Sequence, residues 1–413
     1  MKEIVLTPTY MSSFNCIGSE CEDSCCIGWK VTLDKKSYQK YKNIRHAEVG
    51  GELRNGLKRI KNGAASELQY GYFKMDNKGR CPMLDTNNLC SIQLNLGEDH
   101  LSPVCSTYPR MFNKINNEYE LSAKLSCPEV ARLALLNPNG IDFEKKEIEV
   151  SSTWSSYKNL KLESKAIEES HFWKIREFCI DIVQNRNLEV SDRLIFLGLF
   201  INKLQELLYS RKYVLIDELI KEYQIKINNR DYLVSISNIN DSISLQIEAL
   251  LKLIVVRKKA GVSNPRYVEC LNDMIRGLNI EGEEEIKIED LENRYIYNYK
   301  NYYLPFFNEH GYIMENYIVN YMFERMFPDL TGNVFGEYTK MATLFAILKV
   351  HLVGISGYYK ELNTSIVLKT IQSFVRSIEH NEYYLKGMME ILNENKFTSL
   401  AHIASLLKDR KIK

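Results

Sequence analysis

Cysteine is concentrated in one part of this chain of 413 residues. Eight of the ten cysteines fall within residues 16–127, and the rest of the chain contributes only Cys179 and Cys270. Cysteine thiolates bind zinc and iron–sulfur clusters, so this contrast indicates an inorganic centre in the N-terminal third. We expect the remainder to be a helical body that supports a site or holds a substrate.

The clustered cysteines could instead form four disulfides, if the chain were secreted. The start of the chain, Met-Lys-Glu-Ile-Val-Leu-Thr-Pro, has no apolar run as long as a secretory signal. No window consists of the roughly 18 to 20 apolar residues that span a bilayer. We therefore expect a soluble, cytoplasmic protein with no membrane partner, in which the cysteines bind metal or do redox work.

Length and composition set outer limits on the fold. The length allows two or three domains, or one large helical body with an added module. An apolar fraction of 45% can fill a sizeable core. The net charge of +1 and the pI of about 7.5 give no electrostatic reason to expect a nucleic-acid partner.

Loops and short elements are expected in the N-terminal third. The turn residues at 85–88 predict a fold-back of the chain that brings Cys81 and Cys90 close together. Asp34 is a suitable N-cap for a helical pattern over 34–62, which Gly50-Gly51 interrupts. The other expected features are a short mixed stretch with little periodicity at 1–14, a loop at 16–29, irregular chain at 63–80 with a strand leading to a turn at 73–79, a helix at 91–96 ending at Gly97, an extended segment at 118–125, a helix at 128–136 and a polar linker around 137–160.

The remainder of the chain has helical periodicity almost throughout. The expected helices are 165–186, 194–208 capped by Ser191-Asp192, 213–224, 230–257, 265–277, 312–327, 335–356, 364–379, 382–393 and 398–408. We therefore predict a mainly α protein. Residues 1–136 would form a cysteine-rich metal-binding module with short irregular or strand elements, and residues 137–413 a large all-α helical body.

The spacing of the cysteines does not fit one zinc finger. Such a site needs two closely spaced pairs, and only Cys16-x4-Cys21 and Cys21-x3-Cys25 come near that pattern. The later cysteines are widely separated singles, and a four-thiolate cluster would also leave some over. Cys21-x3-Cys25 matches the start of the radical S-adenosylmethionine triplet, but position 28 is glycine where the third cysteine should stand. No Gly-x-Gly-x-x-Gly motif indicates a Rossmann-type site.

The segment Pro103-Val-Cys105-Ser-Thr-Tyr108-Pro109-Arg110 adds chemistry beyond ligation. Tyr108 can stack or donate its hydroxyl, and Arg110 can bind a carboxylate or balance the charge of a cluster. The alternative is structural: Tyr108 packs the wall of the site, and Arg110 makes an internal salt bridge.

These segments resemble the flagellin lysine-N-methylase family. The resemblance lies in the run from Cys16 to Trp29, in Cys81-Pro and Cys90-Ser-Ile, and in Cys105-Ser-Thr-Tyr-Pro-Arg110. A looser pattern is shared with a wider group of zinc- or iron-chelating cysteine-cluster proteins. A second match, Glu315-Asn-Tyr-Ile-Val-Asn320-Tyr-Met-Phe-Glu-Arg-Met-Phe327-Pro328, lies far downstream, so the resemblance covers most of the chain.

The resemblance implies methylation of lysine ε-amino groups of flagellin, with S-adenosylmethionine as donor. It also implies an iron–sulfur cluster, [4Fe-4S], with zinc as the alternative metal. The matching cysteines are Cys16, Cys21, Cys25, Cys26, Cys81, Cys90 and Cys105; the four that recur in the looser pattern are Cys25, Cys81, Cys90 and Cys105. Cys127 is the least secure member of the set, and no residue is assigned to binding the methyl donor.

Lysine methylation sets a further requirement. The ammonium group, with a pKa near 10.4, must lose its proton before it can attack a sulfonium methyl. The tyrosine-rich segment 295–327 could line such a pocket, or it could be ordinary helix packing. The expected catalytic residues are Tyr108, Arg110, Glu315 and Asn316, with Asn320 as a further polar candidate; His171 and His310 are expected to be structural.

Two other functions fit the same residues. One is a non-catalytic zinc- or iron-binding module whose helical body binds a protein partner. The other is a cluster carrier or redox protein. An assay for iron, sulfide and methyl transfer separates all three.

Overall fold

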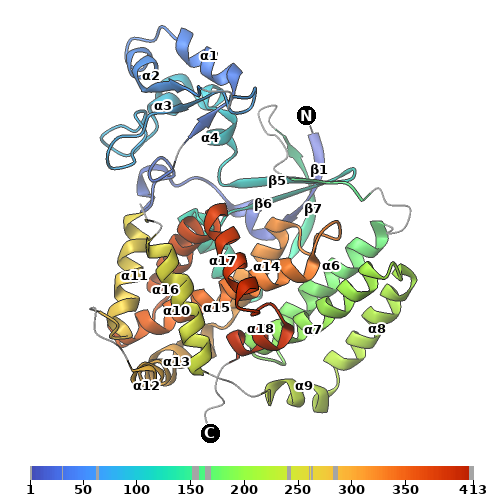
Figure 1. Ribbon diagram of the computed structural model, residues 1–413. Helices are drawn as coiled ribbons and strands as arrows, with labels where there is room; N and C mark the ends of the chain where they lie inside the picture. The colour runs from blue at the N-terminus through green and yellow to red at the C-terminus, as the bar shows by residue number, and fades with distance from the viewer. Residues whose placement is uncertain are drawn as a thin grey trace. The chain divides into compact units, whose positions relative to one another are not determined.

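The computed structural model describes residues 2–29, 31–61, 65–150, 158–162, 169–239, 243–259, 261, 264–281 and 287–408 (Figure 1). Contacts within the chain define two compact units. The first, called here the N-terminal unit, comprises Met1–Val130 and Asp142–Asn159; the second, called the helical body, comprises Ala131–Ile141 and Leu160–Lys413. The predicted domain boundary after residue 136 stays a prediction.

The N-terminal unit contains a five-stranded sheet with the order β7-β1-β6-β5-β8. Its strands are β1 (Lys2–Pro8), β5 (Arg110–Ile115), β6 (Glu118–Ala123), β7 (Phe143–Glu149) and β8 (Asn159–Leu160). Strand β1 runs parallel to β6 and antiparallel to β7, while β5 and β6 form a hairpin. The extended segment predicted at 118–125 is confirmed.

Two sequence expectations about this sheet are wrong. The stretch at 1–14, in which little periodicity was found, contains β1, and the expected polar linker contains β7. Strand β7 lies at the edge of the sheet, where one side has no neighbouring strand, and most of its side chains are at least partly exposed. A solvated edge strand does not need alternating apolar residues, so its sequence looks like a linker.

A second sheet, β2-β4-β3, carries a small hydrophobic core. Its strands are β2 (Thr32–Leu33), β3 (Leu57–Arg59) and β4 (Gly71–Phe73), and its helices are α1 (Lys35–Asn43) and α2 (Gly50–Gly56). Asp34 caps α1 as predicted, accepting a hydrogen bond from the Ser37 amide. The predicted helix over 34–62 is therefore two short helices followed by a strand, with the break near the two glycines.

The fold-back at residues 81–90 is confirmed. Leu84 and Cys90 form an antiparallel bridge, and the Ser91 amide donates to the Met83 carbonyl at 2.8 Å. The Asp85 carboxylate closes the turn by accepting from the Leu89 amide at 2.8 Å. Helix α3 (Ser91–Leu96) follows and ends at Gly97, whose φ of +85° suits glycine.

The described part of the helical body contains no sheet of its own. Its helices are α6 (Glu169–Gln184), α7 (Val190–Tyr209), α8 (Ile216–Ile227), α9 (Arg230–Ser237), α10 (Ile243–Lys259), α11 (Pro265–Gly277), α12 (Ile288–Asn298), α13 (Leu304–His310), α14 (Tyr312–Arg325), α15 (Val334–Tyr359), α16 (Thr364–Phe374), α17 (Glu382–Glu394) and α18 (Leu400–Leu407). The predicted fold class, a mixed cysteine-rich module followed by a helical body, is confirmed.

Three details of the helix predictions differ from the structure. The predicted helix 230–257 is two helices, and residues 240–242 lie outside the described part. Helix α7 begins at Val190 with Glu189 as its N-cap, so Ser191-Asp192 lies inside it. The chain from α12 to α13 is helical as well, with a π-helical turn, η5 (Tyr299–Tyr303), between them. A second π-helical turn, η6 (Val375–Glu379), follows α16.

Helix α15 is the centre of the helical body. It packs against α7, α11, α12, α16 and α18. By length and composition alone it could cross a bilayer, with a mean hydropathy of 1.5 over its best window, but 89% of that window is buried. A helix that is apolar on all sides is expected when other helices surround it.

Candidate functional site

Four cysteines of the N-terminal unit share one electrostatic neighbourhood. The thiolates of Cys25, Cys90 and Cys105 each raise the pKa of Cys81, and those of Cys25 and Cys90 raise the pKa of Cys105. For both thiols the larger cause is burial, and the pKa reaches about 12. A site that disfavours free thiolates in this way favours a bound cation that neutralises them.

Backbone amides also point at these sulfur atoms. The amides of Ile92 and Gln93 lower the pKa of Cys90, against the larger effect of burial, and the Met83 amide does the same for Cys81. Cys90 is the N-cap of α3, so its sulfur lies at the amino end of a helix. Donors of this kind stabilise ligand thiolates.

Cys127 belongs to this neighbourhood, although sequence reasoning left it out of the ligand set. Burial raises the pKa of its thiol to about 12, and the thiolates of Cys21 and Cys25 raise it further. The Glu129 and Val130 amides oppose this effect. Cys25 is thus the neighbour common to both cysteine groups. The signal in the sequence was Cys127-Pro128, a cysteine directly before a helix with proline at its first position.

The two remaining predicted ligands are placed differently. Cys16 is exposed. Cys26 packs against the hydrophobic core of the unit, and its carbonyl accepts from the Cys81 amide at 2.9 Å. Exposure does not separate them from the other cysteines, since Cys25 is exposed as well, so their ligand role stays a prediction.

The cysteine arrangement bears on the kind of metal. Among the described residues, no three His, Cys, Asp or Glu side chains are placed to hold a single ion. A lone zinc ion draws all four sulfur atoms to about 2.3 Å from one point. A four-iron cluster holds each thiolate on a different iron. Cysteine thiols with amide donors beside them are chemically suited to either kind of centre.

Tyr108 and Arg110 lie in the same unit as the cysteines. Tyr108 follows the short helix α4 (Pro103–Thr107), which carries Cys105. Its hydroxyl is 3.1 Å from the Ser126 hydroxyl, and its ring is 6.3 Å from that of Trp29. The Arg110 guanidinium lies 5.2 Å from the centre of the Phe14 ring. Both side chains are therefore beside the loops that carry cysteines.

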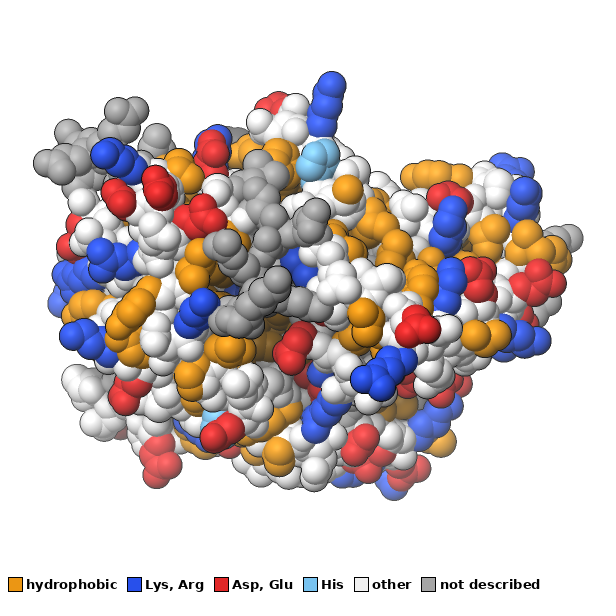
Figure 2. Space-filling view, turned by 90° about the horizontal axis from the view of Figure 1, so that it is seen from below, with side chains coloured by type: hydrophobic (Ala, Val, Ile, Leu, Met, Phe, Trp, Pro, Cys, Tyr) orange, Lys and Arg blue, Asp and Glu red, His pale blue; other side chains and the backbone are white. Residues whose placement is uncertain are grey.

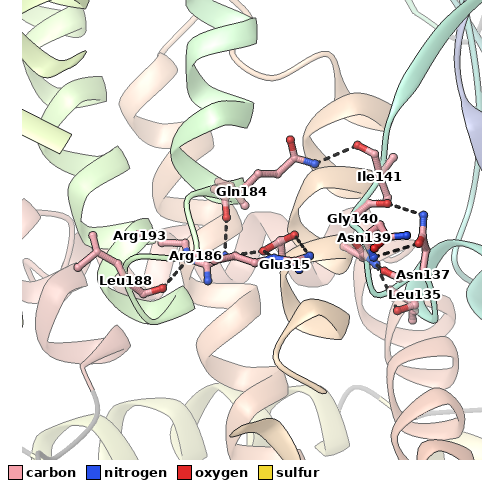
Figure 3. Close-up of polar contacts among 12 residues, drawn as sticks. Leu135, Asn137, Asn139, Gly140, Ile141, Gln184, Arg186, Leu188, Arg193 and Glu315 are labelled. Carbon is pink, nitrogen blue, oxygen red and sulfur yellow. Dashed lines mark hydrogen bonds and ion pairs between the residues drawn. The ribbon is translucent and has the colours of Figure 1, made fainter. Parts of the chain in front are cut away.

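Glu315, on α14, lies in the helical body within a buried charge network (Figure 3). Its carboxylate accepts two hydrogen bonds from Arg186, at 2.8 and 3.0 Å, and one from Arg193, at 2.7 Å. Gly140 approaches the same carboxylate: a Cβ built on it would be 3.2 Å from Oε1, and its φ is +94°. Glu315 is therefore an anchor for three segments of the helical body.

The Asn316 side chain also holds the turn at 137–141, through hydrogen bonds that its amide nitrogen donates. Its Nδ2 donates to the carbonyls of Leu135 and Asn137, at 3.3 and 2.9 Å. Its Oδ1 is buried and has no partner among the described residues. The Asn137 side chain in turn donates to the Gly140 carbonyl, and Gln184 donates to the Ile141 carbonyl (Figure 3). The turn at 137–141 is thus held on both sides.

The tyrosine-rich segment is largely helix packing. Tyr295 and Tyr303 are buried, and the rings of Tyr299 and Tyr303 stack at 5.2 Å. The Tyr317 hydroxyl donates to the buried Glu379 at 2.6 Å. Tyr297 alone among these five tyrosines is more than half exposed, at 56%.

The remaining sequence candidates can be placed briefly. Cys179 and Cys270 are buried in the helical body, as expected for core residues. His310 contacts the Tyr312 hydroxyl at 3.2 Å. Sequence reasoning missed Ser102 and Tyr41, which lie beside Cys105. The only available signal for Ser102 was a serine directly before proline at a helix start.

Comparison with known proteins places the chain in a family. The model of the FliB lysine N-methylase C-terminal domain matches residues 176–406. The lysine-N-methylases of Salmonella typhimurium and Salmonella choleraesuis are each 27% identical over 312 residues, which is 71% of this chain and 72% of each relative. The flagellar biosynthetic protein FliU of Salmonella muenchen is 36% identical over 149 residues, 36% of this chain and 86% of that protein. No solved structure matches.

The matched region contains α14 and its buried Glu315, so the resemblance seen in the downstream segment is confirmed. The expectation of an enzyme, a protein-lysine methyltransferase, is confirmed at the level of the family. With more than half of its residues matched by the family model, the chain belongs to the FliB lysine N-methylase family.

Proposed function

We propose that this protein methylates lysine ε-amino groups of flagellin, with S-adenosylmethionine as methyl donor and a [4Fe-4S] cluster held by cysteines of the N-terminal unit. Family membership and the flagellar biosynthetic relative support the reaction and the substrate. The observation that carries the cofactor is the shared neighbourhood of Cys25, Cys81, Cys90 and Cys105. When bound, an iron–sulfur cluster supplies iron that can exchange an electron.

The chain's own residues have defined tasks under this proposal. Cys25, Cys81, Cys90 and Cys105 hold the cluster, and the amides after Cys81 and Cys90 stabilise their thiolates. Arg110 balances negative charge on the cluster or binds the carboxylate of the donor. Tyr108, beside the same loops, stacks on a bound group or donates its hydroxyl.

Glu315 suits a positioning role in catalysis. A methylase has to take a proton from the substrate ammonium. The Glu315 oxygens already accept three hydrogen bonds from two guanidinium groups, so they are engaged in holding the helical body together. Glu315 therefore orients α14, while Asn316, whose buried Oδ1 has no partner among the described residues, is the other predicted catalytic residue on this helix.

The proposed location and partners follow from the same function. We propose that the enzyme acts in the cytoplasm, on flagellin before export. On the face drawn in Figure 2, lysine and arginine side chains are intermingled with aspartate and glutamate. A mixed surface of this kind, with a net charge of +1, suits a protein substrate better than nucleic acid.

One experiment tests substrate and reaction together. Flagellin is purified from cells with and without the gene for this protein, and lysine masses are measured by peptide mass spectrometry. Loss of methyl-lysine in the deletion strain, restored by the wild-type gene, supports the proposal. Identical methylation in both strains contradicts it. Anaerobically purified protein that transfers labelled methyl groups from S-adenosylmethionine to flagellin identifies the donor.

The metal has its own test. Anaerobic protein is assayed for iron, acid-labile sulfide and zinc, and its visible spectrum is recorded. About four iron and four sulfide per chain are expected for a [4Fe-4S] centre. Stoichiometric zinc without sulfide would overturn the cofactor proposal and leave the methylation proposal to the flagellin experiment.

A further inference from the structure

Ser102 is a helix-capping residue that does not use its side chain to cap. It is the N-cap of α4, and its carbonyl accepts from the amides of Cys105 and Ser106, each at 2.9 Å. Serine at this position normally accepts a further bond from a first-turn amide through its hydroxyl, which stabilises a helix by about 1 kcal/mol. Here the side chain makes no capping bond.

The Ser102 hydroxyl is also buried. The residue is 0% exposed, and its Oγ has no well-formed hydrogen bond with any described group. A buried hydroxyl without a partner is costly, because it has given up its hydrogen bonds to water. Such a group calls for a partner that becomes available in another state of the site.

Two groups lie beside this hydroxyl. Ser102 is the N-cap of α4 and Cys105 is the third residue of this helix, the position that an N-cap side chain faces across the first turn. In keeping with this geometry, the hydroxyl lowers the pKa of Cys105 against the larger effect of burial. The Tyr41 oxygen is the other neighbour, and it also lies next to the Ser102 amide. Tyr41 is itself held in place, because its hydroxyl donates to the His100 carbonyl at 2.7 Å.

Of these two, a charged sulfur is the stronger acceptor. Hydrogen bonds to ionised groups are roughly twice as strong as neutral ones. The Tyr41 oxygen is neutral, since burial raises the pKa of this phenol far above its ordinary value. Once Cys105 is an anionic ligand, the Ser102 proton is therefore directed to sulfur.

We propose that Ser102 is a positioning residue that donates a hydrogen bond to the Cys105 thiolate and thereby raises the reduction potential of the centre that this thiolate holds. This inference rests on the proposed function, because it requires a redox-active cluster. Each added electron makes the centre more negative, so a donor to a ligand sulfur stabilises the reduced form more than the oxidised form. Helix α1, through Tyr41, and helix α4, through its N-cap, together fix the donor.

The test compares reduction potentials of the full-length, cluster-containing protein. Ser102→Ala removes the donor and is expected to make reduction about tenfold less favourable, a shift of about 59 mV to lower potential for one electron. Ser102→Gly should give the same shift while remaining compatible with an N-cap. Ser102→Thr keeps a hydroxyl and should restore most of the wild-type potential.

Ser106→Ala is the matched control. Ser106 lies on the same short helix and is also buried, but its hydroxyl is directed to the Pro103 carbonyl at 3.3 Å. Its removal should leave the potential unchanged. Potentials are read by electron paramagnetic resonance and visible absorbance during anaerobic redox titration.

The outcomes separate this inference from the proposed function. If wild-type protein holds iron and sulfide but the Ala and Gly variants at position 102 keep the wild-type potential, the inference about Ser102 is wrong and the cofactor proposal stands. If wild-type protein holds no iron and sulfide, both fail. A shift as large in Ser106→Ala would point to a general effect on α4 and would also overturn the inference.

Discussion

Glu315 and Arg193 form an ion pair inside the helical body, with 2.7 Å between Oε2 and Nη1. Only 2% and 8% of their side chains are exposed. The pair joins α14 to α7, residues far apart in sequence, and Arg193 also donates to the carbonyls of Val183 and Leu188. Since both charges are buried, removal of either one would leave the other without a countercharge in the interior.

Replacement of Glu315 should destabilise the helical body strongly. In Glu315→Gln the Arg193 guanidinium stays buried without its countercharge, which costs about 3–5 kcal/mol. Urea unfolding followed by the circular dichroism of the helices measures this loss.

Arg186 offers the matched control. It binds the same carboxylate, but 48% of its side chain is exposed. Arg186→Ala leaves the Glu315–Arg193 pair intact and should cost only about 1 kcal/mol or less. Equal losses in the two variants would show that Arg193 does not depend on the buried carboxylate.

The sequence could identify α14 as significant but could not identify its partners. The family resemblance picked out Glu315, while Arg186 and Arg193 are more than a hundred residues away and look like ordinary surface charges on a helical pattern. Ion pairs of this kind form only in the packed tertiary structure, and the local periodicity of the sequence does not show which residues will meet. The cysteines could be singled out from the sequence because residue type alone marks them, and their role as ligands stays a prediction.

The sequence also predicts edge strands and breaks within helices less well than it predicts regular helices. The helical body was predictable because apolar residues repeat along α11, α16 and α17 with helical spacing. Strand β7 was missed because an exposed edge strand carries polar residues. The broken helix between α9 and α10 was missed because Asn238 and Ser237 interrupt the pattern only weakly. Ser102 was missed because its one local signal, a serine before proline at a helix start, does not show that the hydroxyl is buried and makes no capping bond.

Helices α11 and α15 pack through two glycines. A Cβ built on Gly277 would lie 1.7 Å from the Gly354 carbonyl oxygen, which is backbone and cannot move aside. Gly277→Ala should therefore force the helices apart and cost at least about 3 kcal/mol, at the upper end of overpacking effects. Thermal unfolding and the yield of soluble protein measure the effect.

Gly387, unlike Gly277, should accept an alanine side chain without a clash. It lies inside α17, and nothing approaches within 4 Å of the Cβ built on it. Gly387→Ala should stabilise the protein by about 0.5–1 kcal/mol, because alanine loses less backbone entropy in a helix. If Gly277→Ala is tolerated as well as Gly387→Ala, the close contact of α11 with α15 is wrong.

Substitution of the cysteines should separate ligands from core residues. Cys81→Ser and Cys105→Ser should remove most of the visible absorbance of the cluster and lower the iron content, because a serine hydroxyl is a poor substitute for thiolate. Cys179→Ser and Cys270→Ser, both in the helical body, should keep the absorbance. Full absorbance in both the Cys81 and Cys105 variants would refute these two as ligands.

Cys127 distinguishes the two cysteine groups. Its thiol neighbours Cys21 and Cys25 but not Cys81, Cys90 or Cys105 among the residues that shift its pKa. If Cys25, Cys81, Cys90 and Cys105 are the ligands, Cys127→Ser should retain the iron of the wild type. Loss of iron as complete as in Cys81→Ser would move Cys127 into the ligand set.

Buried His351 should make the helical body less stable in acid. Its Nε2 lies 3.0 Å from the Tyr267 hydroxyl, and its Nδ1 donates to the Ile347 carbonyl at 2.9 Å, so the neutral ring is fully bonded. Burial lowers the pKa of His351 to about 4, from an ordinary value of 6.5. Between these two values the unfolded chain binds the proton and the folded chain does not, so stability falls as pH falls through this window.

The size of the effect follows from the two pKa values. Lowering the pH from 7 to 5 should remove about 2 kcal/mol from the free energy of unfolding through this one residue. In His351→Gln that part of the pH dependence disappears, because glutamine does not titrate, although the variant is less stable at pH 7. Urea unfolding at both pH values measures the difference between wild type and variant. An equal loss in both proteins would mean that the pKa of His351 is the same in the folded and the unfolded chain, so that burial does not lower it.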